Sequence, residues 1–245
     1  MQIRYTESAV AFLDVLGYKE LVKGSVESQD KLNSLQSLVT QIIDEPIKLN
    51  MQVNTDLVPI DLLPVGISIS DSIILSAPLS APLTPYYNGL YVIVMRCIQL
   101  AQKFLAQGFL IRGGIDVGLV CHTSSNIVGP AYQMAYEIES KVANDPCILL
   151  SEKAEKIFND NPFEVFSEIS IKDINENLCE KKYGSSYLMV NTLHSSYFSN
   201  MLNIEQTLDQ YQQIISNQHQ LLTDNRAKEK WKWFEAYLIS KQKKY

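Results

Sequence analysis

Ser-Ala-Val-Ala-Phe-Leu-Asp-Val-Leu-Gly, residues 8–17, is the stretch that decides the fold, together with Ile-Ser-Ile-Ser-Asp-Ser-Ile-Ile-Leu at residues 67–75. In both stretches an apolar run that suits a buried strand reaches an aspartate at a turn. These aspartates are Asp14, followed closely by Gly17, and Asp71, at the tip of a predicted hairpin. If the two strands are neighbours in a sheet, the two carboxylates can bind divalent metal ions together.

Apolar spacing along the rest of the chain predicts alternating strands and helices. The predicted strands cover 8–13, 64–70, 72–77, 109–118, 119–128, 146–151 and 186–191, with 119–128 as the hairpin partner of 109–118. The predicted helices cover 19–49, as one broken helix or two closed by Pro46, then 86–107, 130–143 and 198–240. The order strand–helix–strand–strand–helix–strand predicts an α+β fold with a ferredoxin-like β-α-β-β-α-β core.

The length and composition indicate one main domain. The chain has 245 residues, of which 46% are hydrophobic, and this is enough for a globular core. We expect residues 1–195 to form the domain that carries the site, and residues 196–245 to form a C-terminal helical extension packed on it. The stretch from Arg226 to Tyr245 combines basic and aromatic residues, as in an amphipathic helix whose aromatic side chains dock on the body of the protein.

The same composition argues against several classes of protein. A net charge of −6 does not favour a broad nucleic-acid surface, which needs concentrated Lys and Arg. The N-terminal residues lack the apolar core of a signal peptide, and aspartates and prolines interrupt the apolar run from 57 to 83. The four cysteines show no Cys-x-x-Cys pairing, so neither a zinc site nor a disulfide framework is indicated. We therefore expect a cytoplasmic protein without a membrane span or a nucleic-acid partner.

Four motifs, in order along residues 8–151, together resemble those of class III nucleotidyl cyclase domains. Phe-Leu-Asp-Val-Leu-Gly-Tyr at 12–18 is similar to the Phe-x-Asp-Ile-x-Gly-Phe motif of that group, and Ser-Asp-Ser at 70–72 lies at the hairpin of its second metal-binding aspartate. Arg-Gly-Gly-Ile-Asp-Val-Gly at 112–118 resembles the Arg-x-Gly-Ile-x-x-Gly strand. Residues 129–140 align without gaps on the Gly-x-x-Val-Asn-x-Ala-Ser-Arg-Met-Glu-Ser helix. Within the group, the chain most resembles the pyrimidine cyclases of the Pycsar antiphage systems.

The resemblance implies a metal site and a phosphate site at the end of the first strand. Asp14, the carbonyl of Val15 and Asp71 would hold two Mg²⁺ or Mn²⁺ ions against a nucleoside triphosphate. Backbone N–H groups of the turn would face the phosphates, and this turn consists of Leu16, Gly17 and Tyr18. The alternative reading is that the two aspartates are only a helix N-cap and a turn former.

One departure from the group concerns charge at the reacting phosphate. The position of the arginine that steadies this charge holds Glu137, for which we expect a surface ion pair with Lys141 one turn further on. Another cation must then supply the positive charge. Arg112 is our candidate catalytic residue for this role, and the alternatives are Lys181 and Lys182.

The positions that read ribose and base also depart from those of the purine cyclases. Gln133 stands where these enzymes place the asparagine that orients the ribose, and its longer amide can do similar work. Ile67 and Asn126 stand where they place the lysine and the acid that read the base. Recognition of a purine in the usual way is therefore not expected. A pyrimidine is smaller, and Tyr132 or Tyr136 would fill the remaining space in such a pocket, with Tyr18 near the phosphates as a third candidate.

The resemblance implies a metal-dependent cyclase that converts UTP, or less favourably CTP, into the 3′,5′-cyclic monophosphate and pyrophosphate. The product would be an antiphage signal read by a separate cyclic-nucleotide-binding effector. A homodimer is expected, with metal-binding residues from one subunit and the 126–137 segment from the other. Two alternatives remain open at this point: a catalytically degenerate module that only binds nucleotide or regulates a partner, and a different nucleotidyl or phosphoryl transferase on the same core.

Overall fold

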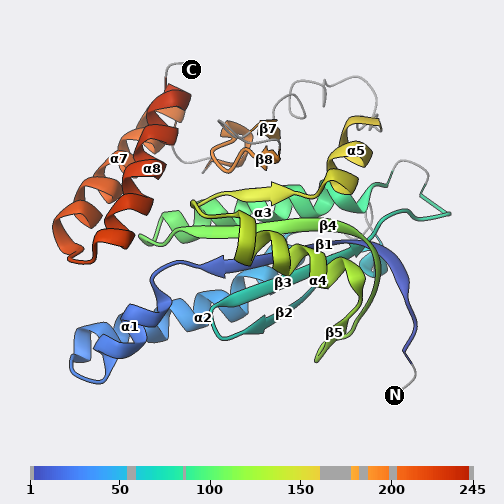
Figure 1. The fold of residues 1–245 in the computed structure, drawn as a ribbon, viewed down its shortest axis with the longest axis horizontal. Coiled ribbons are helices and arrows are strands. Elements are labelled where there is room, and N and C mark those ends of the chain that lie inside the picture. The colour runs from blue at the N-terminus through green and yellow to red at the C-terminus, as the bar shows by residue number, and fades with distance from the viewer. Residues whose placement is uncertain are drawn as a thin grey trace.

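A mixed sheet lies at the centre of the computed structural model, which describes residues 3–53, 59–84, 87–160, 178–181, 187–198 and 203–242 (Figure 1). Its strands are β1 (Thr6–Val15), β2 (Val65–Ile69), β3 (Ser72–Pro78), β4 (Ile111–His122), β5 (Ile127–Val128), β6 (Ile148–Leu150), β7 (Cys179–Lys181) and β8 (Leu188–Val190). The α-helices are α1 (Tyr18–Ser25), α2 (Gln29–Met51), α3 (Gly89–Leu105), α4 (Pro130–Glu137), α5 (Glu152–Asp160), α7 (Ile204–Leu221) and α8 (Asn225–Gln242). Short 3₁₀ turns lie at Ile60–Leu62 and Ser195–Tyr197, and a π-helical turn lies at Ile138–Val142.

The topology confirms the predicted α+β fold. The strand order β2-β3-β1-β4 with antiparallel pairing, joined by α1 and α2 before β2 and by α3 before β4, is the ferredoxin-like arrangement. β6 then extends the sheet parallel to β4, and β8 and β7 complete that edge in antiparallel pairing. The end of β1 therefore lies between the β2–β3 hairpin and the start of β4, in the middle of the core sheet.

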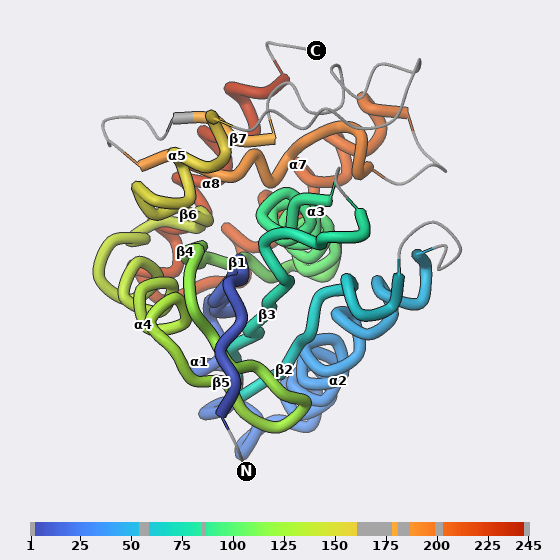
Figure 2. Tube along the Cα trace, turned by 90° about the vertical axis from the view of Figure 1, so that its right-hand side faces the viewer, coloured from blue at the N-terminus to red at the C-terminus, as the bar shows by residue number. Residues whose placement is uncertain are grey.

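The alternation of side chains along β1 assigns its residues to two layers. Ala11 and Leu13 join the large core cluster beneath α2 and α3, whereas Val10 and Phe12 join a smaller cluster beneath α4. In Figure 2 the strands run between α4 on one side and α2 and α3 on the other. Asp14 continues the series of Val10 and Phe12, so it belongs to the face of the sheet that α4 covers.

Residues 19–49 form two helices, and Pro46 does not close the second one. α2 continues to Met51 with Pro46 inside it. A proline within a helix has no N–H for the carbonyl four residues earlier, which here is that of Ile42. The hydroxyl of Ser68 in β2 donates to this carbonyl at 2.9 Å. The prediction of a helix end at Pro46 was wrong because a neighbouring strand satisfies the acceptor that proline leaves unpaired.

The prediction that residues 119–128 form a separate hairpin partner was also wrong. β4 continues to His122, and the returning strand β5 has only two residues. The reversal occurs at residues 123–126, where the amide of Thr123 donates to the carbonyl of Asn126 at 2.8 Å and its hydroxyl accepts from the amide of Asn126 at 3.1 Å. A polar turn of this kind ends the strand, whereas Gly118 lies within it.

α4 approaches the sheet closely because the strand below it contains glycine. A Cβ atom on Gly114 would lie 2.2 Å from the carbonyl oxygen of Ala135 and 2.7 Å from Cβ of Ile138. The predicted helix 130–143 changes from α to π geometry after Glu137, so that the consecutive residues Ile138 and Glu139 are both buried.

α7 and α8 pack as an antiparallel pair on a second core cluster at the β6 and β8 side of the sheet. Trp231, Phe234, Tyr237 and Leu238 of α8 are buried in this cluster, in line with the expected docking of aromatic residues. The same cluster contains Leu105 of α3 and Ile138 of the turn after α4, so it reaches the helices on both faces of the sheet. No helix among the described residues combines the length and the apolar character needed to cross a membrane.

Candidate active site

Asp14 and Asp71 lie next to each other at the end of β1. Asp14 is opposite Ser72 in the β1–β3 register, and Asp71 immediately precedes Ser72 at the hairpin tip. The amide of Val15 donates to the carbonyl of Asp71 at 3.0 Å, and the carboxyl group of Asp71 is close enough to contribute to the raised pKa of Asp14. The structure thus brings together the two predicted metal-binding carboxylates, with Val15 beside them.

The surroundings of Asp14 oppose its ionisation. Burial, followed by the charges of Glu139 and Asp71, raises the pKa of Asp14 from 3.8 to about 7, although Arg112 acts in the opposite direction. A cation between two such carboxylates removes their repulsion, and carboxylate and carbonyl oxygens are the donors that Mg²⁺ and Mn²⁺ prefer. Among the residues that the structure describes, no three His, Cys, Asp or Glu side chains form a metal-binding group. A metal ion at this position would therefore need both aspartates, together with oxygen ligands that do not come from side chains, such as backbone carbonyls.

Arg112 faces Asp14 from the neighbouring strand β4. The two residues are direct partners in the β1–β4 register, and Nε of Arg112 lies 3.6 Å from Oδ2 of Asp14. The same Nε lies only 2.6 Å from Oε1 of Glu139, a residue that is 4% exposed. Burial raises the pKa of Glu139 above its ordinary value, against the lowering effect of Arg112. The predicted catalytic cation is thus placed in the site, and its nearest partner is a buried acid.

Sequence reasoning did not single out Glu139, although a signal was present. The buried residues Ala131 and Ala135 of α4 are spaced by four, and Glu139 is the next member of the same series. An acid on an otherwise small and apolar helical stripe needs a buried partner. We overlooked Glu139 because the predicted site residues are at other positions of the same motif.

The turn after β1 keeps two of its three predicted phosphate-binding amides. The amide of Leu16 already donates to the carbonyl of Leu110 at 2.9 Å, so it is occupied. Gly17 has φ +90° and precedes α1, and no side chain caps the start of that helix. The amides of Gly17 and Tyr18 are therefore the candidates that this turn offers to an anion.

The tyrosines of α4 lie on the face of the sheet that Asp14 shares. Phe12 contacts both, with ring centroids 6.1 Å from Tyr132 and 5.2 Å from Tyr136. Tyr136 is 48% exposed, and Gln133 on the same helix is also exposed. These predicted nucleotide-binding residues therefore line an open surface of α4 rather than a closed pocket of this chain.

Glu137 forms the predicted surface ion pair. Its Oε2 lies 3.4 Å from Nζ of Lys141, and both side chains are exposed, so this prediction is confirmed. Of the alternative cations, Lys182 and the side chain of Lys181 lie outside the described residues. Arg112 is consequently the cation that the described part of the chain places beside the aspartates.

Asn126 is far from the aspartates of its own chain. It lies in the turn beyond Val120, which pairs with Thr6 at the start of β1. Asp14 is eight residues further along β1, a separation of about 25 Å in an extended strand. Ile67 lies beside the small cluster under α4, as an apolar contact. Within one chain, the predicted base-reading position and the predicted metal-binding position do not meet.

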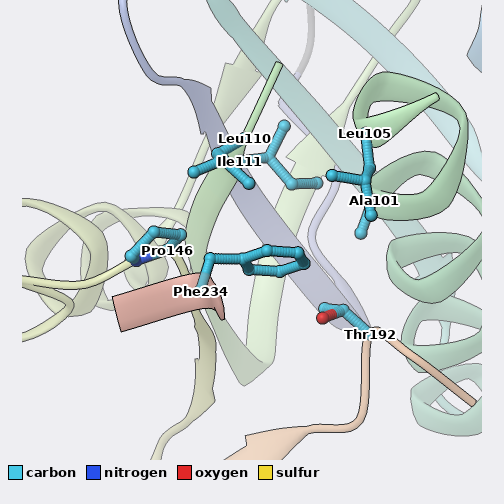
Figure 3. Close-up of a pocket in the computed structure, with 7 residues that line it drawn as sticks. All are labelled: Ala101, Leu105, Leu110, Ile111, Pro146, Thr192 and Phe234. Atoms are coloured by element: carbon cyan, nitrogen blue, oxygen red, sulfur yellow. The ribbon is translucent and has the colours of Figure 1, made fainter. Parts of the chain in front are cut away.

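A small hollow lies elsewhere in the molecule, where α8 meets α3 and the start of β4 (Figure 3). Its lining consists of Ala101, Leu105, Leu110, Ile111, Pro146, Thr192 and Phe234. This lining contains no charged side chain and is apolar apart from Thr192. A triphosphate needs cations or free amides, so the hollow belongs to the packing of the C-terminal helices.

Comparison with solved structures finds similar proteins at low sequence identity. The chain is similar to the adenylyl cyclase CyaB from P. aeruginosa, at 17% identity and a TM-score of 0.48, over 78% of this chain and 97% of that one. It is also similar to the monomeric guanylyl cyclase domain of the RhoGC fusion protein from Blastocladiella emersonii, at 18% identity and a TM-score of 0.46, over 65% and 90%. A class III adenylyl cyclase-like ATP-binding protein from Pseudomonas aeruginosa matches at 12% identity and a TM-score of 0.46, over 87% and 44%.

With TM-scores below 0.5, these similarities are weak and none of them assigns an activity to this chain. No protein-family model matches the sequence. No curated protein matches it either.

Proposed function

We propose that the protein is a metal-dependent nucleotidyl cyclase that acts on a pyrimidine nucleoside triphosphate, with UTP favoured and CTP as the second choice. The observation that carries this proposal is the adjacency of Asp14 and Asp71 beside Arg112, at a strand end that leads into the start of α1. Two carboxylates and one guanidinium at the N-terminus of a helix suit a polyphosphate bound through divalent cations.

Asp14, Asp71 and the carbonyl of Val15 would hold the two Mg²⁺ or Mn²⁺ ions. When bound, these ions lower the pKa of the attacking ribose 3′-hydroxyl and neutralise charge on the leaving pyrophosphate. Arg112 supplies a fixed positive charge one strand away from Asp14, and it takes the role that Glu137 cannot fill.

The amides at the start of α1 would hold the phosphates in place. Gly17 and Tyr18 are the two candidates, while Leu16 contributes through its position in the turn and not through its own amide. Because these groups are part of the backbone, they orient the triphosphate without adding charge. Their position just after Asp14 keeps the phosphates next to the metal-binding carboxylates.

The preference for a pyrimidine rests on the residues that would surround the base. Ile67 is an apolar side chain in the small cluster under α4 and offers no hydrogen bond to a purine. On the same face of the sheet, Tyr132 and Tyr136 contact Phe12 and reduce the space that is left for a base. Asn126 and Gln133 are exposed amides that can bond to base and ribose.

A homodimer would complete the site. Asn126 lies in the turn beyond Val120, whose strand partner Thr6 is about 25 Å along β1 from Asp14, so a single chain does not hold base and metals in one place. In a head-to-tail pair, the aspartates of one subunit would lie beside the 126–137 segment of the other. The dimer would then contain two equivalent sites. The cyclic product would act in the cytoplasm on a separate effector in defence against phage.

One observation favours a second candidate, a nucleotide-binding module without turnover. The exposed Glu137 places a negative charge on α4 where a cyclase benefits from a positive one. This candidate needs the same metals and phosphates but no stabilisation of the reacting phosphate. It therefore predicts binding without product.

A product assay separates the two candidates. The full chain would be incubated with Mn²⁺ and each of the four ribonucleoside triphosphates, and cyclic product and pyrophosphate would be measured. We expect product from UTP, and its loss in Asp14→Ala and in Asp71→Ala. Glu229→Gln, which removes an exposed acid of α8 that pairs with Lys232, is the control and should retain activity. Binding of nucleotide without product from any of the four would support the binding module, and a linear or oligomeric product would indicate a transferase.

A further inference from the structure

We propose that Glu139 is a positioning residue, which keeps the guanidinium of Arg112 from neutralising Asp14 and so leaves that carboxylate to a divalent cation. This inference rests on the proposed function, because it concerns the same site. The observation behind it is the position of Nε of Arg112. Nε of Arg112 is 2.6 Å from Glu139 and 3.6 Å from Asp14, so the closer contact is with the acid that lies outside the proposed metal-binding pair.

Without Glu139, Asp14 would be the one acidic partner left to Arg112 in the part of the chain that the structure describes. Asp14 is its direct neighbour in the β1–β4 register, and a guanidinium can bind a carboxylate through two parallel hydrogen bonds. Such a pair would occupy the oxygens that a metal ion needs. An arginine is therefore useful beside this metal site only if another group restrains it.

The fold provides that restraint at a fixed place. Glu139 belongs to the π-helical turn after α4, and Gly114 allows this turn to lie directly on β4. Its side chain is 5% exposed, whereas that of Arg112 is 27% exposed. The acid is therefore anchored in the interior, and the cation lies between it and the open end of the site.

The geometry also leaves part of Arg112 for the substrate. Both ion pairs described for Arg112 run through Nε. A guanidinium has two further nitrogens in a planar fork, and these are the groups that bind phosphate oxygens. A stability role alone does not account for the arrangement, since a buried ion pair contributes little more than apolar residues of the same volume.

Mn²⁺ binding in the absence of nucleotide tests the proposal. The full chain would be titrated with Mn²⁺ alone near pH 8, by calorimetry or by the electron spin resonance signal of free Mn²⁺. We expect Glu139→Gln to weaken Mn²⁺ binding about tenfold or more, the range found for groups that orient metal ligands. The double variant Glu139→Gln with Arg112→Gln should bind Mn²⁺ within about threefold of the wild type, because the competing cation is gone.

Glu229→Gln is the control, since it removes an exposed acid of α8 that pairs with Lys232 at the surface. It should bind Mn²⁺ as the wild type does, and melting curves would confirm that all variants are folded. Wild-type affinity in Glu139→Gln, or a double variant as weak as the single one, would overturn the inference while leaving the cyclase proposal intact. A wild-type chain that binds no Mn²⁺ would instead remove the metal site, and both proposals with it.

A second measurement separates positioning from simple support of the fold. At saturating Mn²⁺ and with the nucleotide that the wild type turns over, Glu139→Gln should lower kcat more than it raises KM, because a misplaced Arg112 serves the reacting phosphate poorly. An unchanged kcat under these conditions would contradict the proposed role.

Discussion

Two partly buried ion pairs of similar length, one in the middle of the sheet and one at its β7 edge, differ in their neighbours. Nε of Arg112 and Oε1 of Glu139 are 2.6 Å apart near the end of β1, and Nζ of Lys241 in α8 and Oε2 of Glu180 in β7 are 2.5 Å apart at the edge of the sheet. The side chain of Lys241 is 4% exposed, and its Nζ lies 5.3 Å from the ring centre of Tyr237. Each pair joins an acid to a base, so the chemistry of the pair alone does not distinguish them.

The surrounding charges make the difference. Beside Lys241 and Glu180, the hydroxyl of Tyr237 donates to Oδ1 of Asn191 at 3.0 Å, and burial keeps the pKa of Tyr237 well above its usual value, so this neighbour is neutral. Beside Arg112 and Glu139 lie the carboxyl groups of Asp14 and Asp71, and the pKa of Asp14 is raised to about 7. As far as the described residues show, the first environment is balanced, as a structural pair requires. The environment of Arg112 and Glu139 contains more acidic than basic groups, which is typical of a site that binds a cation.

The largest expected effect is the loss of function when this negative charge is reduced. In Asp71→Asn the turnover of nucleotide should fall by about a thousandfold, because a metal ligand worth several kcal/mol of barrier is lost. The melting temperature should stay the same or rise, because the repulsion that acts on Asp14 is relieved. Turnover with Mn²⁺ and thermal unfolding would be measured on the same preparation. A large loss of stability in this variant would break the comparison.

The other pair should respond in the opposite way. Lys241→Ala leaves Glu180 without its cation and should lower the free energy of unfolding by roughly 3 kcal/mol, with the activity per folded molecule unchanged. Lys232→Ala is the control on the same helix. Lys232 pairs with Glu229 at the surface, and its loss should cost less than about 1 kcal/mol. Denaturant unfolding of the three proteins would measure this difference, and equal losses in both variants would count against it.

The raised pKa of Asp14 predicts a dependence of stability on pH. The folded state holds the proton of Asp14 up to about pH 7, whereas the unfolded chain releases it near 3.8. Without divalent ions, the contribution of Asp14 to stability is therefore full below pH 4 and is lost as the pH rises to about 7. The difference in stability between the wild type and Asp14→Asn, measured by denaturant unfolding from pH 4 to 8, should follow this window.

Mn²⁺ should reverse this trend, because an ion that binds the ionised carboxylate stabilises the folded state at the higher pH. A difference between the two proteins that stays constant with pH would show that Asp14 titrates normally.

Most strands of the core and the strand-end positions of the two aspartates could be predicted because local patterns determine them, whereas β7 was not predicted. The apolar run before Asp14 and the polar hairpin tip at Asp71 need no distant partner to be read. The errors occurred where a contact across the fold decides the outcome. Pro46 stays inside α2 because Ser68, from a strand further along the chain, satisfies the free carbonyl. The spacing along α4 marks Glu139 as a buried acid, but its partner is known only once the fold brings Arg112 of β4 to it.

The smallest expected effect concerns the backbone that carries Asp71. Ser70 has φ +58° and is the one non-glycine residue with positive φ among those that the structure describes. Glycine adopts this conformation without the cost that a Cβ atom imposes. Ser70→Gly should therefore raise the free energy of unfolding by about 1 kcal/mol or less, since the greater freedom of glycine in the unfolded chain offsets part of the gain.

Ser72→Gly is the matched control, because Ser72 lies in the extended strand β3 two residues later. There glycine should destabilise by roughly 0.5–1 kcal/mol. Chemical denaturation of both variants gives the sign of each change. If Ser70→Gly were as destabilising as Ser72→Gly, the hairpin tip would not be strained. The contrast between a strained, charge-rich end of the sheet and a relaxed, balanced edge would then rest on side chains alone.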